Sequence, residues 1–448
     1  MSEQIEGIEQ RLIAAGIAEY EIYLLHESNF EKQFLIDETD LTKEGHAWSY
    51  TVRVLAQEAD RTGIGTVRSM SFRPEEVDTV VQQAVAMASL NAEPQYHFPP
   101  PAGAYPEVEG VEPAVKDDPA GVLSDQTEIL LANVPKSGAI PTFGKLRLIT
   151  DEQWLRNSSG VDASHASNHW FLEFALKAEQ GTKKAEFWGT HYAARVADLN
   201  LAERIPTWGT YAQENLAAKM PEVEEGVTVV FPPKVLAEAF VPVIGHHASA
   251  AARHEGTTRF NEIGKQVARE DFSLWDDGLL AGGLGTAPWD GEGSPQQQSA
   301  IIADGAFQGW LYDQRHALIF GEPSTGNGVR GGAGQIDCDL HNLTCSTGAG
   351  TFADLIREID HGLYVAQFSW LNPTELTGSF GAEIRNGYEI EGGELARPVK
   401  GGSVAGNVLS MLNDIVGLTT TTEIVPARDG NAGAKLPWMA FSNLKISQ

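Results

Sequence analysis

Residues 288–317 read PWDGEGSPQQQSAIIADGAFQGWLYDQRHA, a loop containing glycine followed by two short apolar runs. The runs QQQSAIIA and AFQGWLYD are separated by Asp304-Gly305. Because both central residues of a tight hairpin turn need positive φ, an Asp-Gly pair between apolar runs predicts an antiparallel β-hairpin. Glycine-rich loops flank this hairpin, AGGLGTAPWDGEGSP before it and GEPSTGNGVRGGAGQ after it.

The elements around the hairpin mix strands and helices. Before it, a buried strand at 227–231 and a Pro232-Pro233 turn lead into one alanine-rich helix, VLAEAFVPVIGHHASAAARHE. The lack of a regular βαβ alternation favours the α+β class. After the hairpin we expect a helix at 351–360, a strand at 363–370, paired strands around Gly392-Gly393, a helix at 403–412 and a final strand near 438–446.

The first half shows the two-residue period of antiparallel strands. Trp48, Tyr50, Val52 and Val54 alternate with polar residues, which predicts a strand with one buried face. Proline at position 74 fits the first turn of a helix whose valines and alanines face the sheet. Further strands are expected from 19, after 63, at 143–151 and at 168–178, and further helices at 4–15, 121–133 and 199–219.

Residues 92–119 carry seven prolines and no periodicity. They predict an extended strap that crosses the surface of the first domain. A chain of 448 residues is too long for one ordinary core. We therefore expect two α+β domains, residues 1–222 and 223–448, each with a mixed, largely antiparallel sheet and packed helices.

Composition excludes several partners. The formal charge of −29 repels the phosphates on which nucleic-acid binding depends, and it disfavours anionic membranes. The start, MSEQIEGIEQ, lacks the features of a signal peptide, and no stretch reaches the length of apolar residues that a membrane helix needs. Two cysteines give no disulfide framework, so we expect a cytoplasmic protein.

Residues 244–260, IGHHASAAARHEGTTRF, are rich in histidine and suggest a metal site. A helical zinc site needs imidazoles at i and i+4, but Ala250, Ala251 and Thr258 stand four residues after the three histidines. His247 and His254 are two turns apart in an intact helix, roughly 10 Å, which is too far to share an ion. Histidines that are structural or that contact substrate are the better interpretation.

Three other groups deserve comparison. Cys338, His341 and Cys345 could bind zinc if a fourth ligand came from elsewhere, although the run is irregular for a zinc site. Asp290 and Glu292 could act as acid and base, but they fit better as braces of their loop. His165 and His169 have the i,i+4 spacing in a turn that leads into a strand, where about 13 Å would separate them.

Several ordered motifs resemble those of the TldD/PmbA family of candidate DNA gyrase modulators. In the second half these are residues 288–317, STGNG, LYVAQFSWLNPTELTGSFGAEIRNGYEIEGGEL and GGSVAGNVL. In the first half EIYLL, YTVRVL, GIGTVRSM and NSSG are similar to the N-terminal domain of that family. The resemblance extends over most of the chain. It implies a dimer with a channel in which an unfolded peptide lies extended against strand edges.

The resemblance also implies two kinds of subunit. One kind carries an HExxxH helix completed by a late cysteine and is a zinc metallopeptidase, whereas the PmbA-like kind lacks the metal helix. Here the corresponding segment reads HHASAAARHEG, and no cysteine occurs in LTGSFGAEIRNGYEIEGGEL. The chain therefore resembles the metal-free branch, with no cofactor of its own and zinc expected in a homologous TldD-like partner subunit.

The leading hypothesis is a non-catalytic subunit that shapes a channel for unfolded peptide, paired with the zinc-bearing homologue or with itself. A self-sufficient hydrolase is the first alternative, and a peptide-binding scaffold without an enzymatic partner is the second. The hydrolase would be a metal-dependent peptidase that uses His246, His247, His254 and Glu255 as a nonstandard metal or acid/base site. Candidate channel residues are His247, His254, Asp290, Glu292, Tyr312 and Asn327.

Overall fold

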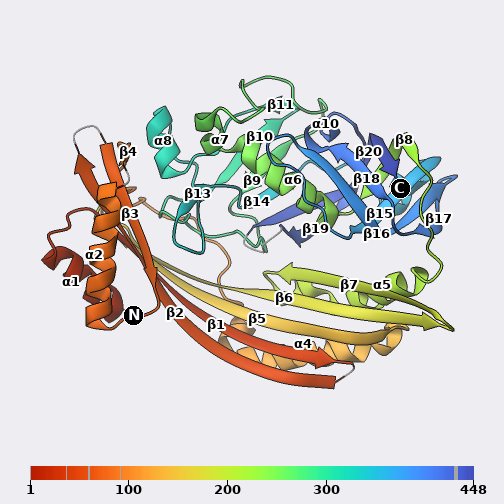
Figure 1. The fold of residues 1–448 in the computed structure, drawn as a ribbon, viewed down its shortest axis with the longest axis horizontal. Helices are drawn as coiled ribbons and strands as arrows, with labels where there is room; N and C mark the ends of the chain where they lie inside the picture. The colour runs from red at the N-terminus through yellow and green to blue at the C-terminus, as the bar shows by residue number, and fades with distance from the viewer. Residues whose placement is uncertain (1, 37, 59–60, 91, 428–431) are drawn as a thin grey trace.

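The computed structural model describes residues 2–36, 38–58, 61–90, 92–427 and 432–448. Its two halves form two layers: a long curved sheet from the first half lies beneath the strands and helices of the second half (Figure 1). Each half buries its own hydrophobic clusters. The expected mixture of strands and helices is confirmed, whereas the boundary between residues 222 and 223 stays a prediction.

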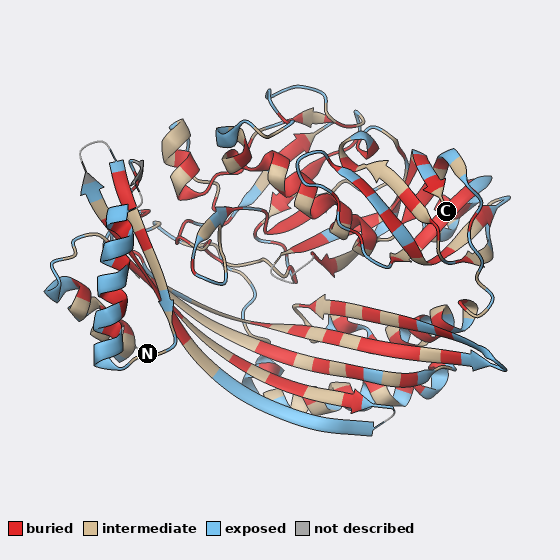
Figure 2. Ribbon diagram, viewed as in Figure 1, coloured by how far each residue is buried: buried red, intermediate tan, exposed pale blue. Residues whose placement is uncertain are grey.

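The first sheet has seven antiparallel strands in the order β4-β3-β2-β1-β5-β6-β7. Alternation sets its faces, because Trp170, Leu172, Phe174 and Leu176 of β6 are all fully buried, as their two-residue spacing predicts. Burial alternates along the long strands in the same way (Figure 2). The strands are β1 (Tyr20–Leu35), β2 (Glu38–Glu58), β3 (Arg61–Ser69), β4 (Ala92–Pro94), β5 (Ile140–Asn157), β6 (Asp162–Gln180) and β7 (Lys183–Ala193).

Helices cover one face of this sheet. Helix α2 packs so closely on β3 that a Cβ placed on Gly65 would lie 1.8 Å from the carbonyl oxygen of Ala84. The sheet thus presents its other face to the second half (Figure 1). The helices are α1 (Ser2–Ala14), α2 (Pro74–Leu90), α3 (Pro113–Asp117), α4 (Pro119–Asn133) and α5 (Leu201–Glu214).

The second sheet has eleven strands, five of which close into a barrel. Strands β8, β15, β16, β18 and β20 pair in a ring, and the pairs β8–β15 and β14–β20 are parallel. The strands are β8 (Glu224–Phe231), β9 (Leu274–Asp277), β10 (Gln298–Ala303), β11 (Ala306–Phe307), β14 (Asn342–Cys345), β15 (His361–Phe368), β16 (Ser379–Glu391), β17 (Glu394–Val399), β18 (Ser403–Asn407), β19 (Ile415–Pro426) and β20 (Gly433–Ser447).

Smaller elements complete the second half. Strands β12 (Gly328–Arg330) and β13 (Ile336–Cys338) form a separate pair. The predicted hairpin is confirmed, because Asp304 and Gly305 join β10 to β11 with φ values of 47° and 76°. The remaining helices are α6 (Pro233–Ala248), α7 (Ala250–Glu255), α8 (Gln314–Phe320), α9 (Phe352–Arg357) and α10 (Val408–Met411).

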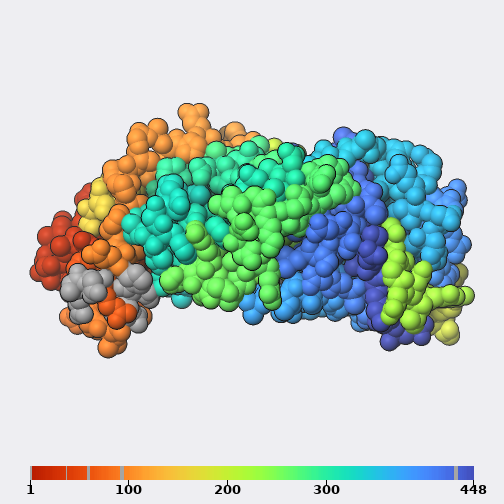
Figure 3. Space-filling view, turned by 90° about the horizontal axis from the view of Figure 1, so that it is seen from above, coloured from red at the N-terminus to blue at the C-terminus, as the bar shows by residue number. Residues whose placement is uncertain are grey.

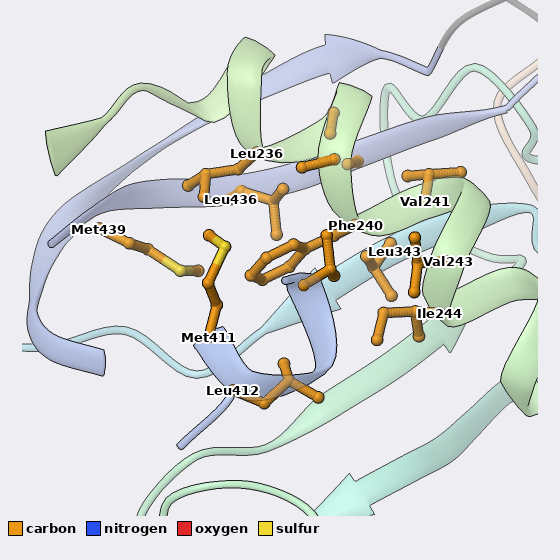
Figure 4. Packing of buried hydrophobic residues seen from close by; sticks show 14 of the residues in the cluster. Leu236, Phe240, Val241, Val243, Ile244, Leu343, Met411, Leu412, Leu436 and Met439 are labelled. Atoms are coloured by element: carbon orange, nitrogen blue, oxygen red, sulfur yellow. The ribbon is translucent and has the colours of Figure 1, made fainter. Parts of the chain in front are cut away.

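Helix α6 lies in the largest hydrophobic core. Its Leu236, Phe240 and Ile244 are fully buried and pack among residues from several strands and from α10 (Figure 4). The predicted single helix through residue 255 is wrong, because Ser249 is extended, with φ −71° and ψ 135°. Ser249 bridges to Leu311 and accepts a hydrogen bond from the Ala251 N–H, so α7 begins as a new helix.

Two other sequence-based expectations are wrong. The predicted helix at 403–412 begins as strand β18, because these residues pair with β16 and β20, and only Val408–Met411 is helical. Tertiary pairing overrides the local pattern here. His165 and His169 lie within β6, rather than in a turn before it, and the extended backbone keeps them apart as expected.

The proline-rich segment is more than a surface strap of the first domain. It includes β4 and α3, and the side chains of Tyr96 and Phe98 are buried. Tyr96 and Tyr105 donate hydrogen bonds to Glu292 and to the carbonyl of Gly293 in the second half. The segment therefore runs between the halves, because its aromatic side chains find their burial there.

Among the residues that the structure describes, no helix is long and apolar enough to cross a bilayer.

Candidate functional site

A cavity of 570 Å³ lies between the two halves. Its floor is formed by β1, β5 and β6 of the first sheet, and its roof by the loops around residues 282–291 and 328–330. Seen from above, the second half covers most of the first sheet (Figure 3). The cavity is therefore built jointly by segments that are distant in the chain.

The sheet wall carries two histidines and a carboxylate. His165 and His169 lie on β6, Asp151 lies on neighbouring β5, and His169 Nδ1 is 3.5 Å from Asp151 Oδ2. Burial, together with the charge of Glu27, raises the pKa of Asp151 to about 7. Burial, together with the charge of Arg147, lowers the pKa of His169 to about 4. Near neutral pH, His169 is therefore uncharged and Asp151 is only partly ionised, so this wall offers polar atoms that carry little net charge.

The loop wall is braced by Asp290. Its Oδ1 accepts hydrogen bonds from the N–H groups of Glu292 and Ser294, each 2.9 Å long, and its Oδ2 accepts one of 2.8 Å from Gly328. Burial raises the pKa of Asp290 to about 8, and the charge of Glu292 adds to this effect. Asp290 lines the cavity, and its hydrogen bonds are those of the loop brace that the sequence favoured.

A buried charge network holds the two halves together beside the cavity. Arg53 of β2 lies 3.3 Å from Glu21 and 3.5 Å from Glu292. Arg330, from the second half, donates to Glu21 at 2.6 Å and stacks over the Tyr23 ring at 4.4 Å. Since each buried charge has partners from both halves, the network fixes how the cavity walls face each other.

A second cavity, of 860 Å³, continues along the same boundary. It is lined by β7 and α5 of the first half and by parts of β15, β19 and β20 of the second. Arg195 lines both cavities, so they adjoin. Arg195 donates to Asp198 at 2.8 Å, which holds its guanidinium at the junction.

The histidines at the end of α6 do not lie at this cavity. His247 is fully buried, accepts a hydrogen bond from the Arg259 N–H through Nδ1 and contacts the Phe260 ring. Burial lowers its pKa to about 4, and neighbouring His246 and Arg259 add to this. The expectation that His247 lines a channel is corrected: its hydrogen bond and packing keep it in the core.

The other predicted residues are scattered. His254 and Glu255 are exposed on α7, away from the cavity residues. Tyr312 accepts a hydrogen bond from Arg253, and buried Asn327 donates to Asp276 and to the Asp339 carbonyl. The four residues of the fallback catalytic set thus do not converge.

Cys338, His341 and Cys345 are not brought together either. His341 faces the cavity and uses Nε2 for the Gly326 carbonyl at 2.6 Å, whereas Cys345 lies in β14. Within the described ranges, one group of three possible metal ligands converges, and it joins Cys338 to Asp313 and His316 instead. The histidines of α6 do not belong to this group.

Sequence reasoning missed most of the cavity wall. Tyr23, Asp151, Arg195 and Arg330 lie on four separate segments, and no local pattern connects them. His165 and His169 offered one signal, because an i,i+4 spacing in a strand places both side chains on the same face. That face proves to be the cavity wall.

Comparison with known proteins gives the family. Residues 224–448 match the PmbA/TldA metallopeptidase C-terminal domain. The chain belongs to the TldD/PmbA metallopeptidase family. The PmbA metalloprotease of Escherichia coli O157:H7 is 23% identical over 367 residues, which are 79% of this chain and 77% of that protein.

A TldD homologue of Buchnera aphidicola from Acyrthosiphon pisum is 28% identical over 246 residues, 54% of this chain. The chain spans about half the length or less of the first TldD homologues it matches, with values of 47%, 36% and 46%. Two solved structures share the fold of this TldD/PmbA chain. TldE from Thermococcus kodakarensis has a TM-score of 0.86 at 24% identity, covering 98% of this chain and all of that one. A candidate modulator of a DNA gyrase from Thermotoga maritima has a TM-score of 0.84 at 19% identity, with full coverage of both chains.

Proposed function

We propose that this chain is a PmbA-like, non-catalytic subunit of a TldD/PmbA-type peptidase, and that the boundary between its halves receives an extended stretch of unfolded peptide. The observation that carries the proposal is the pair of adjoining cavities of 570 and 860 Å³ along this boundary. Their polar walls suit a peptide backbone, which needs hydrogen-bond partners along its whole length.

The expected lack of catalysis rests on the residues in place of the metal helix. In HHASAAARHEG neither the His-Glu pair nor the second His of HExxxH is kept in register, and 376–395 holds no cysteine. His247, which occupies this segment, is committed to core contacts. Proteolysis then requires a homologous subunit that carries zinc, and this chain contributes part of the channel.

The first experiment mixes the purified chain with a family member from the same genome that carries HExxxH. We expect the two to co-purify and to cleave an unfolded peptide, whereas this chain alone is inactive. Cleavage by this chain alone, with one equivalent of zinc that is lost in His247→Ala, would instead establish the self-sufficient hydrolase. If the chain bound peptide but neither co-purified with the homologue nor supported cleavage in the mixture, the peptide-binding scaffold without an enzymatic partner would be the remaining hypothesis.

The second experiment tests the cavity itself. Ser167 lines the cavity on β6, and Ser164 is exposed on the opposite face of the same strand. Ser167→Trp fills the cavity and is expected to weaken binding of a fluorescent unfolded peptide at least tenfold. Ser164→Trp makes the same chemical change outside the cavity and should leave binding unchanged. Equal binding by both variants would place the peptide elsewhere.

A further inference from the structure

Three buried side chains that can bind metal converge where α7, α8 and β13 meet. Asp313, His316 and Cys338 each offer one ligand atom, and these atoms lie within 4.8 Å of one another. Asp313 and His316 stand at the start of α8, and Cys338 ends β13. The cluster lies outside both cavities described above and outside the histidines of α6.

The imidazole and the carboxylate of this cluster are already in direct contact. His316 Nδ1 is 2.6 Å from Asp313 Oδ1, which also accepts the His316 backbone N–H at 2.8 Å. Two ligand atoms on one zinc ion stand only slightly farther apart than this. A metal ion at Nδ1 would take the place of the proton that the imidazole shares with the carboxylate.

The cysteine sulfur lies among polar groups. Burial and the charge of Asp313 raise the pKa of the Cys338 thiol to about 12, and the Ser249 hydroxyl and the N–H groups of Asp313 and Ala250 offset part of this rise. Without a metal, the thiol donates to the Leu311 carbonyl at 3.1 Å. A bound cation would supply the remaining stabilisation of the thiolate, as metals do for cysteine ligands.

We propose that Cys338, His316 and Asp313 form a binding site for a divalent metal ion of the zinc class. The donor set of sulfur, imidazole and carboxylate is one that zinc prefers. Ligand atoms on one zinc lie about 3.5 Å apart, so this cluster needs to contract by roughly 1 Å. A thiolate and a carboxylate balance the two positive charges, which makes the filled site neutral where it is buried.

A further histidine, His254 of α7, stands beside the cluster. His254 is exposed, and its ring centroid is 6.0 Å from that of His316. The three proposed ligands leave a fourth position for water or for this imidazole. A metal ion at this site would run against the expectation that the chain has no cofactor of its own. Its ligands would be His316 and Asp313 beside Cys338, in place of His341 and Cys345.

The test uses cobalt(II) as the probe, because a bound thiolate gives it a visible absorption band. The two cysteines of the chain supply the test variant and its matched control. Cys338 and Cys345 are both free, and Cys345 is absent from the cluster. We expect one equivalent of cobalt to give a sulfur-to-cobalt charge-transfer band in the full chain and in Cys345→Ser. The band should vanish in Cys338→Ser. No band in the unaltered chain, or an undiminished band in Cys338→Ser, would overturn the site.

A second variant tests the site independently, in case Cys338→Ser loses the band because it misfolds. His316→Gln keeps both thiols, and we expect it to bind cobalt at least tenfold more weakly with an unchanged circular dichroism spectrum, as metal affinity measured by competition with a chelator would show. Unchanged affinity would contradict the site. Failure here is separable from failure of the proposed function, because peptide binding in Ser167→Trp and co-purification with the homologue do not involve these residues.

Discussion

The Tyr96 hydroxyl donates a hydrogen bond of 2.7 Å to Glu292 Oε1, and this contact joins the proline-rich segment of the first half to the loop that roofs the cavity. Both side chains are buried. Tyr96→Phe removes the donor and leaves a buried carboxyl group with one partner fewer. We expect a loss of about 1–3 kcal/mol in the free energy of unfolding, measured by urea titration.

Tyr105→Phe is the control for this change. The Tyr105 hydroxyl donates at 2.8 Å to the carbonyl of Gly293 in the same loop, but the tyrosine is only half-buried and its acceptor is neutral. The expected loss is about 0.5–1 kcal/mol. Equal losses in the two variants would mean that the carboxyl group of Glu292 does not depend on Tyr96.

Local patterns predicted the parts of the fold that local rules decide. Asp304-Gly305 specified its turn through the positive φ that both positions adopt, and the spacing of Trp170 and Leu172 specified the buried face of β6. The break in the histidine helix could not be predicted in this way. Ser249 is extended because it bridges to Leu311, a partner that no helical periodicity reveals.

The candidate site was harder to predict, because it exists only where the halves meet. Asp290 was found through its glycine-rich loop, yet the facing wall comes from Asp151 and His169 of the first sheet. The histidine-rich segment attracted attention by composition, but the burial of His247 follows from packing that composition does not encode. A similar limit hid the cluster at Cys338, whose partners lie in α8.

Loss of Arg53 should be the most damaging single change to the buried charge network. Arg53 is 4% exposed and lies between the carboxylates of Glu21 and Glu292. Arg53→Met leaves these carboxylates without that cation, and we expect a loss of about 3–5 kcal/mol in the free energy of unfolding. Equilibrium urea unfolding followed by tryptophan fluorescence measures it.

The matched control is Arg357→Met on α9. Arg357 pairs with Asp354 at 2.7 Å, but its side chain is 68% exposed, so water replaces the partner. The expected change is below about 0.5 kcal/mol. If Arg53→Met and Arg357→Met lowered the free energy of unfolding equally, the contact of Arg53 across the halves would contribute no more to stability than an exposed ion pair.

The stability of the chain should contain a component that falls as the pH rises through the Asp151 titration. Folding raises the pKa of Asp151 from 3.8 to about 7, so the folded chain binds a proton that the unfolded chain has released in this range. The favourable component is complete below pH 3.8 and is lost as the pH approaches 7. Its size is on the order of 2–4 kcal/mol.

Asp151→Asn should remove this component, because asparagine does not titrate. As the pH rises through this range, the unfolding free energy of the original chain should therefore fall relative to that of the variant. His169 opposes the trend, since its lowered pKa makes the folded chain less stable as the pH falls from 6.5 toward 4. The same comparison in chains that also carry His169→Gln separates the effect of Asp151 from that of His169. If Asp151→Asn changed the unfolding free energy equally at every pH in those chains, the assignment to Asp151 would be refuted.

The close approach of α2 to β3 predicts a strong difference between two glycines of the first sheet. A Cβ at Gly65 would lie 1.8 Å from the Ala84 carbonyl oxygen and 2.7 Å from the Ala88 nitrogen, so Gly65→Ala must push the helix backbone away. We expect a loss of about 3 kcal/mol, with faster hydrogen exchange in α2. At Gly45, in the exposed part of β2, an added Cβ meets nothing within 4 Å, and Gly45→Ala should change stability by less than about 0.5 kcal/mol. Unchanged stability and unchanged exchange in Gly65→Ala would show that α2 does not pack on β3 at this distance.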